Sequence, residues 1–226
     1  MPSAASNEQR AASDSAQRIL TYGGARPLAR GGGRRFIDTS FLTELNMTHE
    51  PTAPVPAPAV ASSDADVEFV VERTFDAPRD LVFRAWTEPD RLAAWFGPRG
   101  MPTRTARFDL RPGGTYLYAM AVPGGAEWWG RWVFREVVPP ERVAFVASFS
   151  DPEGGVTRAP FAADWPLETL STVTFAEHAG RTTVTMRGLP INATEAERQA
   201  FKAGHASMTQ GWGGTLDQLA GYLATA

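Results

Sequence analysis

The sequence contains no cysteine among its 226 residues. Disulfides, thiolate nucleophiles and cysteine-ligated zinc or iron–sulfur centres are therefore excluded. A chain without disulfides is compatible with a reducing compartment, and we expect a cytoplasmic location. No apolar run approaches the roughly 20 residues needed to cross a bilayer, so no membrane span is expected.

An excess of charge of either sign is also missing. The net charge is −3, and acidic and basic residues are interspersed along the chain. A protein that binds nucleic acid needs a basic face to neutralise phosphates. We therefore expect no nucleic-acid partner.

Residue patterns that carry metals, cofactors or nucleophiles are not found. The three histidines are His49, His178 and His205, with neither a His-Glu-x-x-His pattern nor a cluster of carboxylates beside them. No metal site is therefore expected. The Gly-Gly pairs lie in hairpins rather than before a helix, and no Gly-x-Ser-x-Gly elbow is present. We expect no cofactor.

The large apolar side chains that are present are unevenly distributed. All seven Trp follow residue 85, and eleven of the thirteen Phe follow residue 68. Residues 65–226 are therefore expected to form one folded domain. Residues 1–64 are rich in Ala, Ser, Gly and Arg and end in a proline-rich spacer, so they bury too little apolar surface to offset their ordering entropy. We expect a disordered or low-complexity extension there.

Three interpretations of this extension remain open. It is a targeting peptide, a tail that binds a partner, or an over-extended start whose natural beginning lies near Met47. Acidic residues and the lack of an apolar core count against the first. We favour the third, in which residues 1–46 do not belong to the expressed protein.

The first part of the folded domain reads as one strand and two short helices. Apolar residues alternate in Val67–Phe75, which is typical of a strand. Asp76-Ala77-Pro78 then signals a helix start, with Asp76 expected to accept N–H bonds of the first turn. Thr87-Glu88-Pro89-Asp90 repeats the signal, and Gly97-Pro98 ends the second helix.

Six strand-like segments follow, separated by Pro- and Gly-rich turns. They are Thr103–Leu110, Thr115–Val122, Glu127–Val138, Arg142–Ser150, Leu167–Glu177 and Arg181–Leu189. Short connections of this kind join neighbouring antiparallel strands. The pattern therefore predicts an antiparallel meander, with one longer loop at Asp151–Pro166.

The last segment predicts one long helix from Thr194 to Leu223. Thr194 and Glu197 match a capping box. Apolar or aromatic residues then recur at helical spacing, at Phe201, His205, Met208, Trp212, Leu216, Leu219 and Leu223. A helix with one such stripe covers the sheet that precedes it, and this arrangement can enclose a pocket.

The order of elements and several short strings resemble a known superfamily. The strings are Phe75–Pro78, Trp86–Pro89, Trp95–Pro98, Asp109–Gly114, Arg135–Arg142 and Gly211–Leu223. Residues 67–223 resemble the START/Bet v 1-like (SRPBCC) superfamily, in the bacterial branch similar to the C-terminal domain of the activator of Hsp90 ATPase. The resemblance implies an α+β helix-grip fold, in which a curved antiparallel sheet, two short helices and a long C-terminal helix enclose a cavity.

Alternation along the strands selects the side chains expected on the concave face. Together with the closing helix they give a candidate ligand-binding wall of Tyr116, Tyr118, Met120, Trp128, Trp132, Phe134, Phe145, Phe149, Met186, His205, Met208 and Trp212. Flexible methionines suit a wall that adapts to apolar ligands. The alternative is that these side chains simply fill a core.

His205 is the one weak catalytic candidate, because it lies on the inward stripe of the last helix. A neutral imidazole there can act as a general base or hydrogen-bond a ligand. The alternative is a core histidine whose ring bonds to a strand hydroxyl. Arg104, Arg107 and Arg131 are candidates for the pocket mouth, with exposure on the strands as the alternative.

Three functions follow from the resemblance and the residues. The leading hypothesis is non-catalytic, stress-linked binding of a hydrophobic small molecule. A polyketide cyclase or aromatase is the second, with His205, Tyr116 or Tyr118 and an arginine positioning an enolate. The third is an Hsp90-type co-chaperone. Eukaryotic activators carry a folded N-terminal domain, and residues 1–64 are too short and too polar to supply one, which counts against a chaperone partner.

Overall fold

The computed structural model describes residues 63–226. The predictions for residues 1–62, including a start near Met47, lie outside the described residues. Residue 64, the last of the expected extension, is the first residue of helix α2 (Asp64–Val67). Its carboxylate pairs with Arg198 of the C-terminal region, and Val67 is fully buried.

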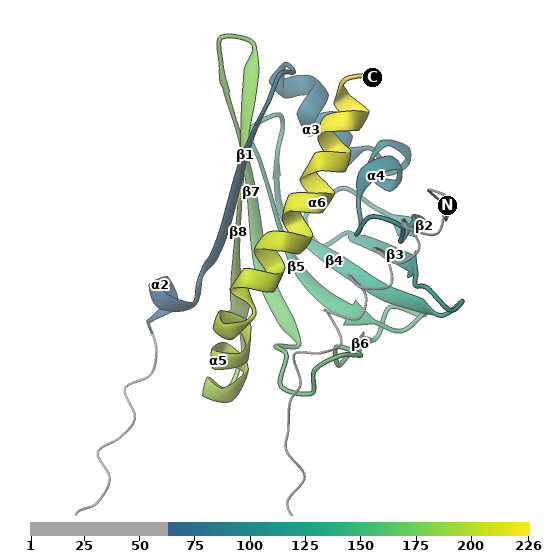
Figure 1. Cartoon of the computed structure of the whole chain (residues 1–226), viewed down its shortest axis with the longest axis vertical. Coiled ribbons are helices and arrows are strands. Elements are labelled where there is room, and N and C mark those ends of the chain that lie inside the picture. Colours follow the sequence, from purple (N-terminus) through teal and green to yellow (C-terminus); the bar gives the residue numbers. More distant parts are fainter. Residues whose placement is uncertain (1–62) are drawn as a thin grey trace, which may run out of the picture. The chain divides into compact units, whose positions relative to one another are not determined.

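An antiparallel sheet forms one layer of the domain (Figure 1). Its strands are β1 Phe69–Phe75, β2 Thr103–Phe108, β3 Thr115–Ala121, β4 Glu127–Val138, β5 Arg142–Ser150, β6 Val156–Thr157, β7 Glu168–His178 and β8 Arg181–Ile191. The order across the sheet is β1-β8-β7-β5-β4-β3-β2, with β6 paired to β5. The expected meander is confirmed, and β1 joins it by pairing with β8.

Four further helices accompany the sheet: α3 Arg79–Thr87, α4 Pro89–Trp95, α5 Glu195–Ala203 and α6 His205–Leu223. In Figure 1, α6 crosses one face of the sheet, and α3 and α4 lie beside its C-terminal half. Apolar spacing explains why α6 lies there, because Leu216, Leu219 and Leu223 share one buried stripe. The α+β helix-grip fold expected from the sequence is confirmed.

The C-terminal helix differs in one respect from the prediction of a single segment. It is divided at Gly204, which separates α5 from α6. Helical hydrogen bonds still run through the division, because the Gly204 N–H donates to the Ala200 carbonyl at 3.0 Å and the Met208 N–H donates to the Gly204 carbonyl at 2.9 Å. The capping box of Thr194 and Glu197 is confirmed at the start of α5.

The predicted cap of the first short helix was wrong. Asp76 does not bond to the first turn of α3 but forms an ion pair with Arg181. The carboxylate that accepts the Arg79 N–H, at 2.8 Å, belongs to Glu177 at the end of β7. A neighbouring strand therefore supplies the negative group that a helix N-terminus favours.

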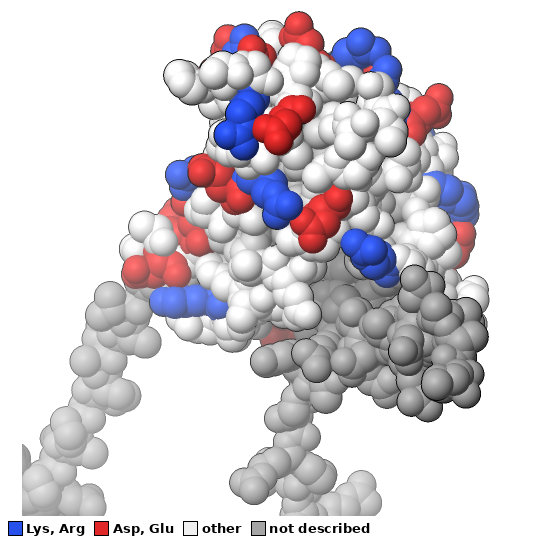
Figure 2. Space-filling model, turned by 45° about the horizontal axis from the view of Figure 1, so that its top comes forward, with Lys and Arg blue, Asp and Glu red and all other residues white. Residues whose placement is uncertain are grey.

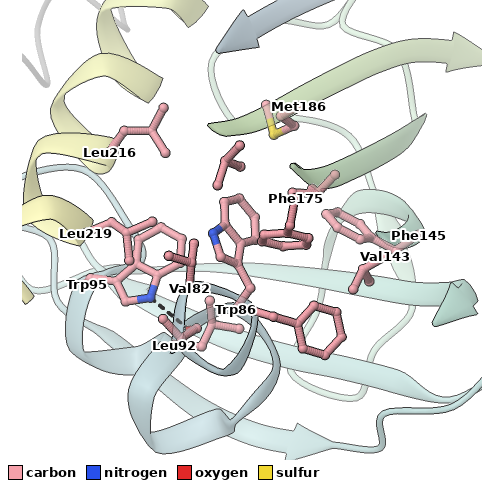
Figure 3. Close-up of a cluster of buried hydrophobic side chains, with 14 of the residues drawn as sticks. Val82, Trp86, Leu92, Trp95, Val143, Phe145, Phe175, Met186, Leu216 and Leu219 are labelled. Atoms are coloured by element: carbon pink, nitrogen blue, oxygen red, sulfur yellow. Dashed lines mark hydrogen bonds between the residues drawn. The ribbon is translucent and has the colours of Figure 1, made fainter. Parts of the chain in front are cut away.

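A cluster of aromatic side chains fills the space between α3, α4, α6 and the sheet (Figure 3). Trp86 and Trp95 meet edge to face at 4.9 Å, and the Trp95 indole donates a hydrogen bond to the Ala85 carbonyl. Leu216 and Leu219 of α6 close the cluster on the helix side. Rings of this size contribute most of the apolar burial of a domain.

Candidate functional site

A cavity of about 420 Å³ lies between the C-terminal helices, the ends of three strands and two loops. Natural ligand pockets occupy roughly 300–1,000 Å³, so this volume suffices for a small molecule. The cavity lies beside the aromatic core and not within it. Phe96 separates the two, because its ring packs 5.2 Å from Tyr118 and 5.0 Å from Trp132 of the core and also lines the cavity.

The helical wall is made mostly of small residues. It consists of Ala200, Ala203, Gly204, Ser207, Met208, Gly211, Trp212 and Thr215. Spacings of three and four place these residues on one face of α5 and α6. Small side chains on that face leave the volume that larger ones would fill.

The opposite wall combines strand ends with a loop. Met120, Trp128 and Phe149 come from β3, β4 and β5, while Phe161, Ala162 and Trp165 come from the loop between β6 and β7. The Phe161 ring lies 5.8 Å from Trp128, 5.6 Å from Phe149 and 5.8 Å from Trp165. These contacts make a continuous aromatic surface.

Gly204 permits the loop to approach the helix. A Cβ atom at this position would lie 2.8 Å from the Trp165 ring, closer than real Cβ contacts. The absent side chain thus makes room for the indole that lines the cavity. Gly204 therefore lies both at the division between α5 and α6 and in this wall of the cavity.

Arg158 and Glu197 hold the same loop against α5. The Arg158 guanidinium donates to the carbonyls of Ala163 and Trp165, each at 3.3 Å, and to the Glu197 carboxylate. Hydrogen bonding to Arg158, and then to the Thr194 backbone N–H, lowers the pKa of Glu197 below its usual value of 4.5. The carboxylate therefore stays ionised at neutral pH and keeps its charge-assisted bond to the loop.

The cavity presents almost no polar chemistry. Among residues 63–226, none of those that line the cavity carries an ionisable side chain. The Thr215 hydroxyl lies 3.1 Å from the carbonyls of Gly97 and Gly211, which leaves Ser207 as the other lining hydroxyl. On the face drawn in Figure 2, Arg, Asp and Glu are intermixed and leave white areas between them. The cavity is therefore suited to an uncharged, largely apolar ligand.

The candidate wall residues divide into two groups. Met120, Trp128, Phe149, Met208 and Trp212 line the cavity. The other candidates pack in the core or against it: Tyr116, Tyr118, Trp132, Phe134, Phe145, Met186 and His205. The stacking of Trp132 on Phe145, with ring centres 4.0 Å apart, illustrates how closely the second group fills its space.

His205 is held away from the cavity. Its Nε2 lies 3.1 Å from the Val67 carbonyl, which can only accept, so Nε2 carries the proton and donates. The ring also packs 5.5 Å from Phe69 and 5.6 Å from Phe201. The partner is thus a backbone carbonyl and not the strand hydroxyl considered above.

The other candidates for cyclase chemistry are also engaged elsewhere. Burial raises the pKa of Tyr116 and of Tyr118 above the usual value, so both phenols are neutral at physiological pH. Arg104 pairs with Glu127 and lies over the Trp129 ring. Arg131 donates to the Ser148 hydroxyl and the Gly154 carbonyl, and the exposed Arg107 does not line the cavity.

Several residues that line the cavity were not predicted from the sequence. Phe161 and Trp165 lie in a loop without strand or helix periodicity, and Phe96, Pro98 and Met101 lie between α4 and β2. No sequence pattern indicates where such loops fold back. The small residues of α5 and α6 did carry a signal, since Gly204, Ser207 and Gly211 recur at helical spacing on the face of Met208.

Within residues 63–226, no group of three His, Asp or Glu side chains is arranged to hold a metal ion. In the same part of the chain, every helix is too short or too polar to cross a bilayer.

Comparisons with known proteins agree with this fold. Residues 76–224 match the family model described as activator of Hsp90 ATPase homolog 1-like protein. No curated protein sequence matches the chain.

Solved structures of bacterial proteins are also similar. The crystal structure of protein Ms6760 from Mycobacterium smegmatis is 26% identical, with 73% of this chain and 94% of that chain covered and a TM-score of 0.58. A protein from Arthrobacter aurescens, solved by solution NMR, is 25% identical. The match covers 75% of this chain and 92% of that chain, with a TM-score of 0.61. A protein from Staphylococcus epidermidis is 26% identical. The match covers 70% of this chain and 89% of that chain, with a TM-score of 0.56.

Proposed function

The chain belongs to the activator of Hsp90 ATPase homolog 1-like family, and from this premise we propose that it binds an uncharged, largely apolar small molecule without transforming it. The site is the 420 Å³ cavity beneath α5 and α6. The observation that carries the proposal is its lining, which within the described part of the chain combines aromatic rings and methionines with no ionisable side chain.

The driving force is the burial of apolar surface. Water in an apolar cavity is released when a ligand replaces it, which contributes roughly 25 cal/mol per Å² of surface removed from water. Met101, Met120 and Met208 add flexible side chains that adjust to the ligand's shape.

Binding without chemistry is favoured over a cyclase-type reaction because the cavity lacks a base. Of the lining residues in 63–226, Ser207 is the only one with a hydroxyl besides the engaged Thr215, and none is His, Asp or Glu. A serine without a neighbouring base is a weak nucleophile. His205 donates to Val67 and does not line the cavity.

The test is to fill the cavity from its helical wall. In Ser207→Phe the added ring would occupy the volume facing Trp128 and Trp165, so we expect binding of neutral aromatic compounds to be lost. Gln210→Phe places the same ring on an exposed helix position outside the lining and is the matched control. Equilibrium dialysis of the full chain against biphenyl, a fused-ring hydrocarbon and a fatty alcohol measures the effect. The proposal is abandoned if the natural protein binds none of the three.

A further inference from the structure

A second, smaller cavity of about 230 Å³ lies next to the first, between α4, the start of β2 and Gln218 of α6. Phe96, Gly97 and Met101 line both cavities. Because three residues face both sides, they form the partition between the two spaces.

Gly97 makes this partition thin. A Cβ atom there would lie 2.8 Å from the Thr103 hydroxyl and 3.8 Å from the Met120 sulfur. Thr103 lines the second cavity and Met120 lines the first. At Gly97 the two cavities are therefore separated by little more than one backbone segment. Its φ of +124° is one that favours glycine, so the partition depends on this residue.

The side-chain donors that line the second cavity are already engaged. The Gln218 Nε2 donates to the carbonyls of Trp95, at 3.2 Å, and Gly97, at 2.6 Å. The Thr103 hydroxyl donates to the Phe96 carbonyl at 2.6 Å. These acceptors fix the orientation of the Gln218 amide and direct its oxygen away from them.

The side-chain acceptors of the same cavity are not engaged. Within residues 63–226, no group donates to the Gln218 Oε1 or to the Thr103 Oγ1. A ligand group that enters this space therefore finds the free lone pairs of the Gln218 and Thr103 oxygens, while the N–H and O–H groups of these two side chains are already used. A hydroxyl is complementary to such a surface, whereas a carboxylate or a phosphate is not. A bound cation would lack a counter-charge there, because no carboxylate of residues 63–226 lines either cavity.

We propose that the two cavities form one bipartite site, in which the larger takes the apolar rings of a ligand and the smaller takes a hydroxyl at the ligand's end. The ligand class is thus a neutral, amphipathic aromatic alcohol or phenol. The flexible Met101 side chain is also part of the partition, and its rotation would connect the two cavities beside the Gly97 backbone. This inference rests on the proposed function, because the apolar body must first bind in the larger cavity.

A pair of probes that differ only at one end tests the inference. Para-hydroxybiphenyl and para-methylbiphenyl have nearly the same size and shape, but only the first can donate a hydrogen bond. Dissociation constants are measured by equilibrium dialysis against the full chain, Thr103→Val and Gln218→Met. Thr105→Val is the matched control, because Thr105 lies on the same strand as Thr103 and lines neither cavity.

We expect the natural protein to bind the hydroxyl probe about three- to tenfold more tightly than the methyl probe, the gain of one net hydrogen bond. Thr103→Val or Gln218→Met should remove this preference, because the hydroxyl probe loses an acceptor that the methyl probe does not use. Thr105→Val should retain the preference. Thermal unfolding of each variant shows whether it is folded, and two separate substitutions keep the test valid if one is not.

The outcomes separate the two proposals. If both probes bind equally well, or if the hydroxyl preference survives both substitutions, the bipartite site is overturned while the binding function stands. If neither probe binds the natural protein, the binding function itself fails and the bipartite site fails with it.

Discussion

His205 illustrates how a single side chain is assigned its role by its hydrogen-bond partner. The ring donates to the Val67 carbonyl and packs between Phe69 and Phe201, so it joins α6 to the chain before β1. These contacts support a structural role for His205, although it belongs to the stripe that faces the sheet.

We predict that His205→Ala lowers the free energy of unfolding by about 1–3 kcal/mol, since it removes a half-buried ring and leaves a carbonyl without its donor. Affinity for an apolar probe should not change, because His205 does not line the cavity. His178→Ala makes the same change at an exposed position and should stay within about 0.5 kcal/mol of the natural protein. Urea unfolding and dialysis measure both quantities. A large loss of affinity with unchanged stability would contradict this assignment.

Glu197 gives a prediction about pH. Its pKa is lowered in the folded protein by Arg158, so its ionised form contributes stability above the ordinary pKa of 4.5, and the contribution is lost as the pH falls below that value. Glu197→Gln keeps a side chain suitable for the capping box but loses the charge. We expect a loss of up to about 1 kcal/mol at neutral pH, modest because Arg158 is half exposed.

The measurement is urea unfolding of the natural protein and of Glu197→Gln between neutral and acidic pH. The difference between them should be constant above pH 4.5 and shrink below it. Glu153→Gln, at an exposed loop position, should show no comparable difference. A gap that widens in acid would contradict the ion pair as its source.

For single residues, the sequence could predict which face of the sheet a side chain points from, but not whether the side chain lines the cavity or is covered by the core. Alternation correctly places Tyr116, Tyr118 and Met120 on the same side of β3, yet only Met120 reaches the cavity. The difference depends on which rings arrive from α3 and α4 to cover the strand, and periodicity carries no information about that.

Among the elements, the junction of α5 and α6 connects backbone geometry to the site. Gly204 and Gly211 both lie on the cavity-facing side of the C-terminal helices, but their surroundings differ. A Cβ atom at Gly204 would collide with Trp165, whereas at Gly211 it would meet no heavy atom within 4 Å.

We predict opposite effects for the same substitution at these two positions. Gly211→Ala should raise the free energy of unfolding by about 0.5–1 kcal/mol through helix propensity alone. Gly204→Ala should lower it by about 1 kcal/mol and weaken binding of an apolar probe, because the displaced Trp165 belongs to the cavity wall. Urea unfolding and dialysis are the measurements. Equal stabilisation by both substitutions would show that the contact with Trp165 is not tight.

Element boundaries were predicted best where turn chemistry is explicit. The bounds of β4 and β5 agree with the prediction because Pro and Gly turns flank them. The cap of α3 was mispredicted because the group that provides it, Glu177, is far away in sequence. The close approach of Trp165 to Gly204 is likewise a contact between segments that are far apart in sequence. Local sequence records neither contact.

For the whole molecule, the core and the cavity are built within residues 63–226. We predict that this fragment alone unfolds within about 2 °C of the full chain and binds apolar probes with the same affinity, as expected if residues 1–62 contribute little to stability. Calorimetric melting and dialysis compare the two proteins. A fragment that aggregates or melts well below the full chain would show that the N-terminal segment contributes to folding.

The overall architecture was predictable because the order of strings and elements is itself a signature of the family. The placement of the cavity was not. We expected a pocket between the concave face and the last helix, with a filled core as the alternative. The rings around Trp86 and Trp132 fill much of this space, and the open volume lies toward Trp128 and Trp165. The volumes of side chains that meet from different elements decide this division between filled and open space, and local sequence does not say which side chains meet.

Trp212 belongs to both regions. Its ring stacks on Trp86 of the core with an interplanar angle of 11°, and it also lines the cavity. A molecule entering the cavity must therefore change the surroundings of a natural fluorophore that is coupled to a second one. The intrinsic tryptophan fluorescence of the protein can therefore serve as a binding assay. A shift in its emission would detect a bound ligand before the ligand is identified.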